Sequence, residues 1–193
     1  MERITAIGEI LFDIYPETKN LGGAPLNFLY HIHKFTGKGN IISRIGNDVL
    51  GKNAIDFIQN NGISTEFIQM DHLHPTGVTT VALDENRGPS FRIDEDRAYD
   101  FIESSSEIGH LVNEDTDCLY FGSRAQRNEV TRNTIQSLLG KGIKYFCDLN
   151  IRQKFYTEEI INKSLAVANV LKINLGKSAN VINIFGNLLD VKI

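Results

Sequence analysis

The sequence of 193 residues contains no tryptophan, only two cysteines, two methionines and four prolines. It has no apolar run of about 18 residues and no basic start followed by an apolar stretch, so we expect neither a membrane-spanning helix nor a secretory signal. Two cysteines are too few for a disulfide scaffold. Cys118 and Cys147 lie in apolar contexts without metal-ligand spacing, which favours reduced thiols in the core of a cytoplasmic protein.

Charge and composition exclude further classes. The net charge of −4 argues against a nucleic-acid partner and against a basic face that binds membranes. With 41% hydrophobic residues the chain is not a disordered polymer. Its length allows one full domain, or a large domain with a small appendage, which buries roughly 70% of the unfolded surface.

Short apolar segments alternate with amphipathic ones along most of the chain. This alternation predicts parallel strand-helix-strand units, and therefore an α/β fold with a central, mostly parallel sheet flanked by helices. The pattern predicts strands over residues 3–8, 10–15, 41–45, 118–121, 144–149 and 170–173, and helices over residues 26–35, 50–58, 129–139 and 157–168.

The middle of the chain departs from this alternation. Residues 77–83 and 89–93 are both extended, and the turn-rich residues 84–88 join them with no helix between. We therefore expect a small antiparallel element that interrupts the α/β pattern.

Two groups of residues near the amino terminus suit a polar ligand. Asp13 ends an apolar strand, and in open parallel sheets ligands gather beyond the carboxyl ends of strands. The run from Gly22 to Asn27 joins two glycines to a proline that opens a helix, with an amide in its first turn. Backbone N–H groups and Asn27 can surround a hydroxylated ligand there. An ordinary strand-exit Asp and an ordinary helix-initiating turn remain open alternatives.

A third group follows the strand at residues 144–149. Asp148, Asn150 and Arg152 alternate, so an extended backbone would direct all three side chains the same way. The alternative is a solvated loop with an ion pair.

No metal centre or hydrolase site is predicted. His31 and His33 are two residues apart in a predicted helix and therefore lie on different faces. His72 and His74 precede Pro75 in a loop, where we interpret the pair as accidental. No phosphate-binding Gly-Lys-Ser/Thr motif follows the glycine pair, and no Ser-His-Asp pattern has a local motif.

Taken in order, the motifs resemble those of the ribokinase-like (pfkB) carbohydrate kinases, and most closely those of bacterial fructokinases. The likeness covers about residues 2–174. It rests on Gly8-Glu9-Ile10-Leu11-Phe12-Asp13, Gly22-Gly23-Ala24-Pro25-Leu26-Asn27, Ser43-Arg44-Ile45-Gly46-Asn47-Asp48-x-x-Gly51, Pro75-Thr76-Gly77-Val78-Thr79-Thr80-Val81, Pro89-Ser90-Phe91, Ala98-Tyr99-Asp100, Phe121-Gly122-Ser123, Asp148-x-Asn150-x-Arg152, Phe155-Tyr156 and Leu171-Lys172-Ile173-Asn174.

The resemblance implies a sheet flanked by helices, with a small β lid, drawn from within about residues 10–25 and 75–100, that folds over a sugar. It also implies ATP and Mg²⁺ as cofactors. By the same resemblance, sugar hydroxyls are bound by Asp13 and Asn27, Gly22 and Gly23 form a hinge and the sugar-facing turn, Tyr99 covers the ring, and Asn150 and Arg152 lie near the phosphates or the substrate.

The sequence also departs from the family pattern. Leu29 and Thr36 stand where smaller residues are expected, and Lys177 stands where the family has a Glu that helps to organise Mg²⁺. The family's Asp-Thr-x-Gly-Ala-Gly-Asp segment, which supplies the catalytic base and the anion hole, is absent from these 193 residues. We therefore expect residues 1–174 to be a partial kinase domain, residues 175–193 to be a divergent tail, and no residue of this chain to be catalytic.

The predicted activity is ATP-dependent phosphorylation of a monosaccharide hydroxyl, with fructose favoured, although this chain alone is expected to be inactive. The alternative is an inert protein that binds sugar or pairs with a kinase. The Asp-x-Asn-x-Arg motif also occurs in kinases of ketodeoxy sugar acids, so the sugar stays open. A homodimer through the lid or an exposed sheet is a further expectation.

Overall fold

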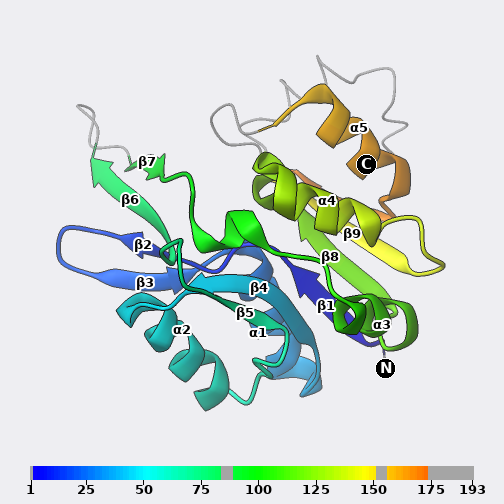
Figure 1. Cartoon of the computed structure of the whole chain (residues 1–193), viewed down its shortest axis with the longest axis horizontal. Helices are drawn as coiled ribbons and strands as arrows, with labels where there is room; N and C mark the ends of the chain where they lie inside the picture. Colours follow the sequence, from blue (N-terminus) through cyan, green and yellow to red (C-terminus); the bar gives the residue numbers. More distant parts are fainter. Residues whose placement is uncertain (1, 84–88, 151–155, 174–193) are drawn as a thin grey trace.

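The computed structural model describes residues 2–83, 89–150 and 156–173, which form two sheets and the helices around them (Figure 1). The larger sheet has six parallel strands in the order β10-β9-β8-β1-β4-β5. These strands are β1 (Ile4–Ile7), β4 (Asn40–Gly46), β5 (Ile68–Asp71), β8 (Cys118–Gly122), β9 (Lys144–Leu149) and β10 (Val170–Ile173). The predicted α/β class with a parallel sheet is confirmed.

Helices cover both faces of this sheet. One face packs against α1 (Ala24–Thr36) and α2 (Val49–Asn60), and its core includes Leu29 and Ile58. The other face packs against α3 (Ser106–Glu114), α4 (Glu129–Ser137) and α5 (Glu158–Val167). Its core includes Ile135 and Ile161. Burial of these two apolar layers is the main favourable contribution to folding.

The helix ends follow from the local sequence. Asp48 is the N-cap of α2 and accepts a hydrogen bond of 2.8 Å from the N–H of Gly51. Thr157 is the N-cap of α5 and accepts one of 3.2 Å from the N–H of Ile160. Gly62 has φ +76° just beyond α2, the left-handed conformation in which glycine commonly ends a helix.

The smaller sheet has four strands in the order β3-β2-β6-β7. It comprises β2 (Leu11–Ile14), β3 (Lys19–Gly22), β6 (Gly77–Leu83) and β7 (Pro89–Ile93). The predicted antiparallel pair over residues 77–93 is confirmed as β6 and β7. β2 lies parallel to β6 and antiparallel to β3. The smaller sheet therefore pairs strands from residues 11–22 with strands from residues 77–93.

Five elements were not predicted. They are β3, β5, α3 and the two short 3₁₀ helices η1 (Ala98–Phe101) and η2 (Arg124–Arg127). β5 is a four-residue edge strand with the sequence Ile-Gln-Met-Asp, too short for periodicity to distinguish it from a loop. Within the part of the chain that the structure describes, no helix combines the length and apolarity needed to cross a bilayer.

Candidate functional site

The carboxylate of Asp13 lies beside the glycine turn. Asp13 is half-buried on β2, and β3 runs antiparallel to it so that Gly22 pairs with Leu11. A Cβ on Gly22 would lie only 3.3 Å from Oδ2 of Asp13. The structure therefore brings together two residues that are nine positions apart in the sequence and that the sequence predicts to share a sugar-binding site.

The turn that follows depends on glycine. Gly23 is the N-cap of α1 with φ 112°, and a Cβ there would lie 2.2 Å from the carbonyl oxygen of Glu9. Asn27 lies on the first turn of α1, where its N–H donates to the Gly23 carbonyl at 2.9 Å and its side chain is exposed. The backbone of the turn is thus fixed, while the amide of Asn27 faces solvent.

Tyr99 lies beneath the smaller sheet rather than at its surface. Its side chain is fully buried in η1, and a Cβ on Gly77 would lie 2.6 Å from its ring. Arg127 stacks over the ring at 5.0 Å. Burial raises the pKa of the Tyr99 hydroxyl far above its ordinary value, so this phenol stays neutral. A role for Tyr99 in covering a sugar ring stays a prediction.

The structure brings together only part of the predicted group of Asp148, Asn150 and Arg152. Asp148 is fully buried at the end of β9, where Oδ2 accepts hydrogen bonds from the Tyr120 hydroxyl and from Lys172 Nζ, each at 2.7 Å. β9 ends at Leu149, and the N–H of Asn150 donates back to the carbonyl of Asp148 at 2.9 Å. The expected extended alternation therefore does not continue through Asn150, because the backbone turns there. Arg152 lies outside the described residues.

Sequence reasoning missed a buried ion pair between Glu9 and Arg124. Glu9 connects β1 to β2, Arg124 opens η2 after β8, and Oε1 lies 3.8 Å from Nε. Burial raises the pKa of Glu9, and the positive charge of Arg124 opposes that rise. Glu9 belongs to a motif that carries the family resemblance, but its partner is 115 positions away (124 − 9) and has no local motif.

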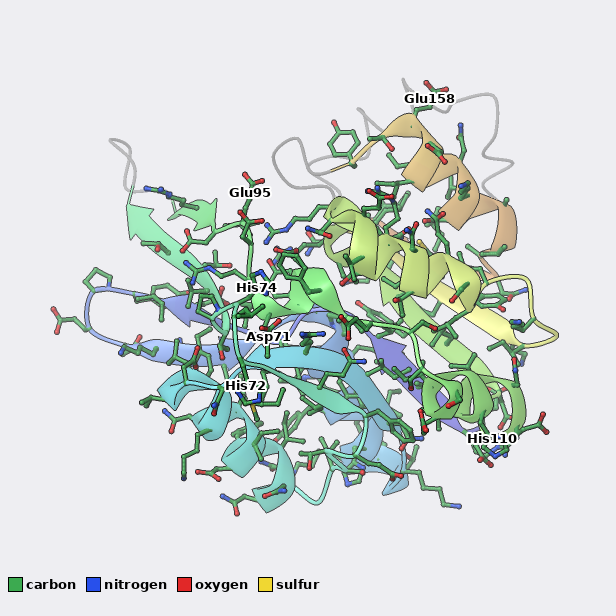
Figure 2. All side chains as sticks on the ribbon, in the orientation of Figure 1. Asp71, His72, His74, Glu95, His110 and Glu158 are labelled. Carbon is green, nitrogen blue, oxygen red and sulfur yellow. The ribbon has the colours of Figure 1, made fainter. Side chains whose placement is uncertain are left out.

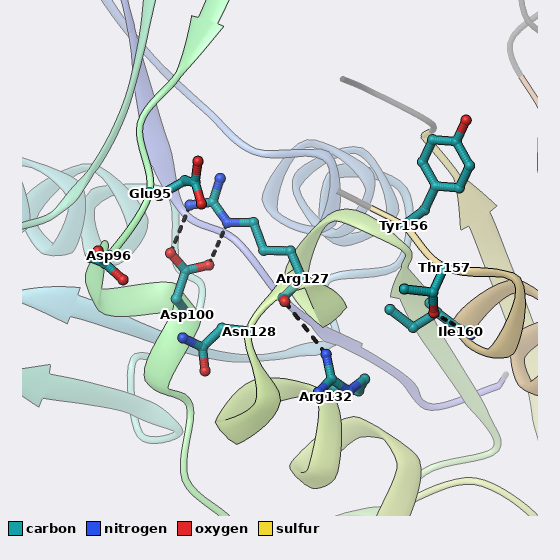
Figure 3. A pocket seen from close by; sticks show the side chains of 9 residues that line it. All are labelled: Glu95, Asp96, Asp100, Arg127, Asn128, Arg132, Tyr156, Thr157 and Ile160. Atoms are coloured by element: carbon teal, nitrogen blue, oxygen red, sulfur yellow. Dashed lines mark hydrogen bonds and ion pairs between the residues drawn. The ribbon is translucent and has the colours of Figure 1, made fainter. Parts of the chain in front are cut away.

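A separate cavity of about 260 Å³ opens between η1, α4 and α5 (Figure 3). Its central contact is a fork in which Arg127 donates to both carboxylate oxygens of Asp100, each at 2.7 Å. The cavity is lined by Glu95, Asp96, Asp100, Arg127, Asn128, Arg132, Tyr156, Thr157 and Ile160. None of the residues predicted to bind sugar lines this cavity.

A further polar group, which the sequence did not predict, surrounds Asp71 at the end of β5 (Figure 2). Arg44 Nε lies 2.7 Å and His74 Nδ1 lies 3.1 Å from Oδ2 of this buried carboxylate. Burial alone would raise the pKa of Asp71, but hydrogen bonds from the backbone N–H groups of His74 and Leu73 outweigh it, and the pKa falls to about 2. His74 thus has a structural partner, although the sequence suggested an accidental pair with His72.

The described residues include no cluster of metal-binding side chains. Across residues 2–83, 89–150 and 156–173, no group of three or more His, Cys, Asp or Glu side chains is placed to hold a metal. Lys177, at the position where the resemblance expects a Glu, lies outside those ranges.

Comparison with solved structures identifies the architecture. An uncharacterised sugar kinase of Pyrococcus horikoshii, solved in complex with ATP, superimposes with a TM-score of 0.81 at 23% identity, over 98% of this chain and 68% of that one. A fructokinase of Xylella fastidiosa with bound ATP also gives 0.81, at 20% identity, over 95% and 61% of the two chains. The architecture is that of the ribokinase-like sugar kinases.

Sequence comparison defines the family. The Pyrococcus horikoshii sugar kinase is 26% identical over 190 residues, and a fructokinase of Vibrio alginolyticus is 25% identical over 186 residues. They align with 88% and 89% of this chain, which spans 60% of the length of each relative. Residues 1–183 match the pfkB family of carbohydrate kinases, and the chain belongs to that family.

Proposed function

We propose that this chain binds a monosaccharide, with fructose favoured, between β2 and the first turn of α1. The observation that carries the proposal is the placement of the Asp13 carboxylate against Gly22, immediately before the fixed turn at Gly23. A carboxylate accepts hydrogen bonds from two hydroxyl groups, and Asn27 adds one amide at the same end of α1. This combination suits a polyol.

We further propose that the bound sugar is the acceptor in an ATP-dependent phosphoryl transfer, as in fructokinases of the same family. The 193 residues contain no Gly-Ala-Gly-Asp segment to supply a base and an anion hole. Loss of both groups removes several kcal/mol of transition-state stabilisation, on the order of 5 or more. The polypeptide by itself is therefore a sugar-binding unit without phosphoryl-transfer activity.

Calorimetric titration of the purified 193-residue chain tests the binding proposal, with fructose, glucose and a ketodeoxy sugar acid in separate experiments. We expect fructose to bind best. The variant Asp13→Asn should weaken binding at least tenfold, at about 1.4 kcal/mol per decade, because the amide loses the charge that strengthens hydrogen bonds from hydroxyls. Asp117→Asn is the matched control, since Asp117 pairs with Arg3 just before β8.

A flat trace with all three sugars would overturn the binding proposal. A coupled assay for ADP, with ATP, Mg²⁺ and fructose present, tests the second part. We expect no turnover above the rate without sugar, and sugar-dependent ADP release by the purified chain would show that it contains a base not identified above.

A further inference from the structure

The ion pair of Glu9 and Arg124 lies where the two sheets meet the first helix. The side chains are 2% and 11% exposed, so both charges are largely removed from water. β1 and β8 are parallel neighbours, and the residues that follow them therefore meet at the carboxyl edge of the larger sheet. The pair thus joins the β1–β2 connection to η2.

Glu9 also contacts the sugar-facing turn twice. Its carbonyl oxygen occupies the space beside Gly23 that any Cβ would need. Its carboxylate oxygen Oε1 accepts a hydrogen bond of 3.4 Å from the N–H of Ala24, the first residue of α1. Gly23 has no side chain with which to cap α1, and the fully described first turn of that helix has no acidic residue. Glu9 therefore supplies from elsewhere in the chain the negative charge that a helix start favours.

A contribution to folding stability does not by itself explain why a charged Glu9 lies in this buried position. Desolvation opposes the ionised form of Glu9, and Nε of Arg124 is too far away for a direct hydrogen bond. Among the described residues, Oε2 of Glu9 and Nε of Arg124 have no hydrogen-bond partner. A neutral pair of similar shape would avoid much of the desolvation penalty.

We propose that Glu9 is a positioning residue, and that its carboxylate, held by Arg124, fixes the turn from Gly22 to Asn27 in the geometry that binds sugar hydroxyls beside Asp13. This inference rests on the proposed sugar-binding function. Glu9 acts through the turn. Its removal therefore weakens sugar binding without unfolding the chain, whereas a purely structural pair would change stability alone.

The test compares fructose affinity and urea unfolding for the wild type, Glu9→Gln, Glu9→Asp, the double variant Glu9→Gln with Arg124→Gln, and the control Asp117→Asn. Glu9→Gln leaves Arg124 as an unpaired buried charge and should be the least stable. The double variant should match or exceed the wild type in stability, yet bind fructose about tenfold more weakly, since neutral hydrogen bonds are roughly half as strong as charged ones.

Glu9→Asp keeps the charge and should restore affinity to within about threefold of the wild type, an effect expected if the charge and not the side-chain length fixes the turn. If the double variant is folded and binds fructose as the wild type does, the inference is wrong while the proposed function stands. If the wild type itself does not bind fructose or the other sugars, the proposed function fails, and the inference fails with it.

Discussion

The hydroxyl of Tyr120 donates a hydrogen bond of 2.7 Å to Oδ2 of Asp148, and both side chains are fully buried. The same oxygen accepts from Lys172 Nζ at 2.7 Å, so strands β8, β9 and β10 are joined by one carboxylate. The ring of Tyr120 also stacks on Phe28 of α1 at 4.2 Å. This contact joins α1, on one face of the sheet, to β8.

Tyr120→Phe removes the hydrogen bond but keeps the stacked ring. We expect a loss of roughly 1.5–3 kcal/mol in the free energy of unfolding, because a bond to a buried charge is lost. Tyr145→Phe is the comparison, since the Tyr145 hydroxyl contacts neutral backbone groups of Leu138 and Lys141 and should cost about 1 kcal/mol. Urea unfolding measures both. Equal losses would mean that the carboxylate adds nothing to the Tyr120 bond.

Gly23→Ala tests the closeness of the turn to Glu9. The new methyl would have to displace the Glu9 carbonyl from a backbone with φ 112°, and we expect a loss of about 3 kcal/mol or more in stability. Gly37→Ala is the matched control, because Gly37 also has a positive φ, of 67°, but has no atom within 4 Å of the added Cβ. That variant should lose only about 1 kcal/mol. Similar losses in the two variants would contradict the steric explanation.

Asp71 should make stability depend on pH in the acid range. Its pKa is about 2 in the folded chain and about 3.9 when unfolded, so the unfolded state binds the proton first. The stabilisation is complete above the unfolded pKa and is lost as pH falls from about 5 to 2. We expect the wild type to lose roughly 2 kcal/mol more than Asp71→Asn over that range.

The measurement is urea unfolding at intervals between pH 5 and pH 2. Asp117→Asn is again the control, because the pKa of Asp117 is also lowered to about 2 by Arg3. That pair is exposed and screened by water. Its removal should therefore change the slope of the free energy of unfolding against pH less than Asp71→Asn does. A slope for Asp71→Asn equal to that of the wild type would refute the assignment.

Cys147 should be unreactive in the native state. It is fully buried, and burial raises the pKa of its thiol to about 12, so almost no thiolate exists at pH 8. A maleimide should therefore label the variant Cys118→Ser only after urea unfolds it. Cys118 is half-buried with a raised pKa and should react slowly in the native wild type. Rapid native labelling of Cys118→Ser would contradict this placement.

The parallel strands and their helices could be predicted because the pattern of apolar and polar residues within each segment is enough to indicate a strand or a helix. Lys144–Leu149 and Val170–Ile173 match the predicted strand bounds, and the glycine after α2 marks its end. β3 could not be predicted, because Lys19 to Gly22 read as a polar turn and become a strand only by pairing with β2. α3 was detectable from its Ser105 cap and its apolar residues Ile108, Leu111 and Val112.

The candidate site, too, could be predicted only in part from the sequence. Asp13 and the Gly22–Asn27 turn are close in sequence, and the family resemblance named them; the structure adds that Asp13 and Gly22 lie side by side. Glu9 and Arg124 were given no role, because only the pairing of β1 with β8 makes them neighbours. Burial likewise cannot be read from the sequence, and it is burial that places Tyr99 beneath the smaller sheet.

Four segments of backbone attach the smaller sheet to the rest of the molecule, and they contact one another in two pairs. Glu9 and Ile10 lie against Gly23. The loop at residues 72–76 is joined to the start of η1, which follows β7, by the hydrogen bond of 2.9 Å from the Ala98 N–H to the Pro75 carbonyl. Asp13 lies on the smaller sheet and Asn27 on α1, so the short connection at Gly23 is where the two parts of the predicted sugar site join.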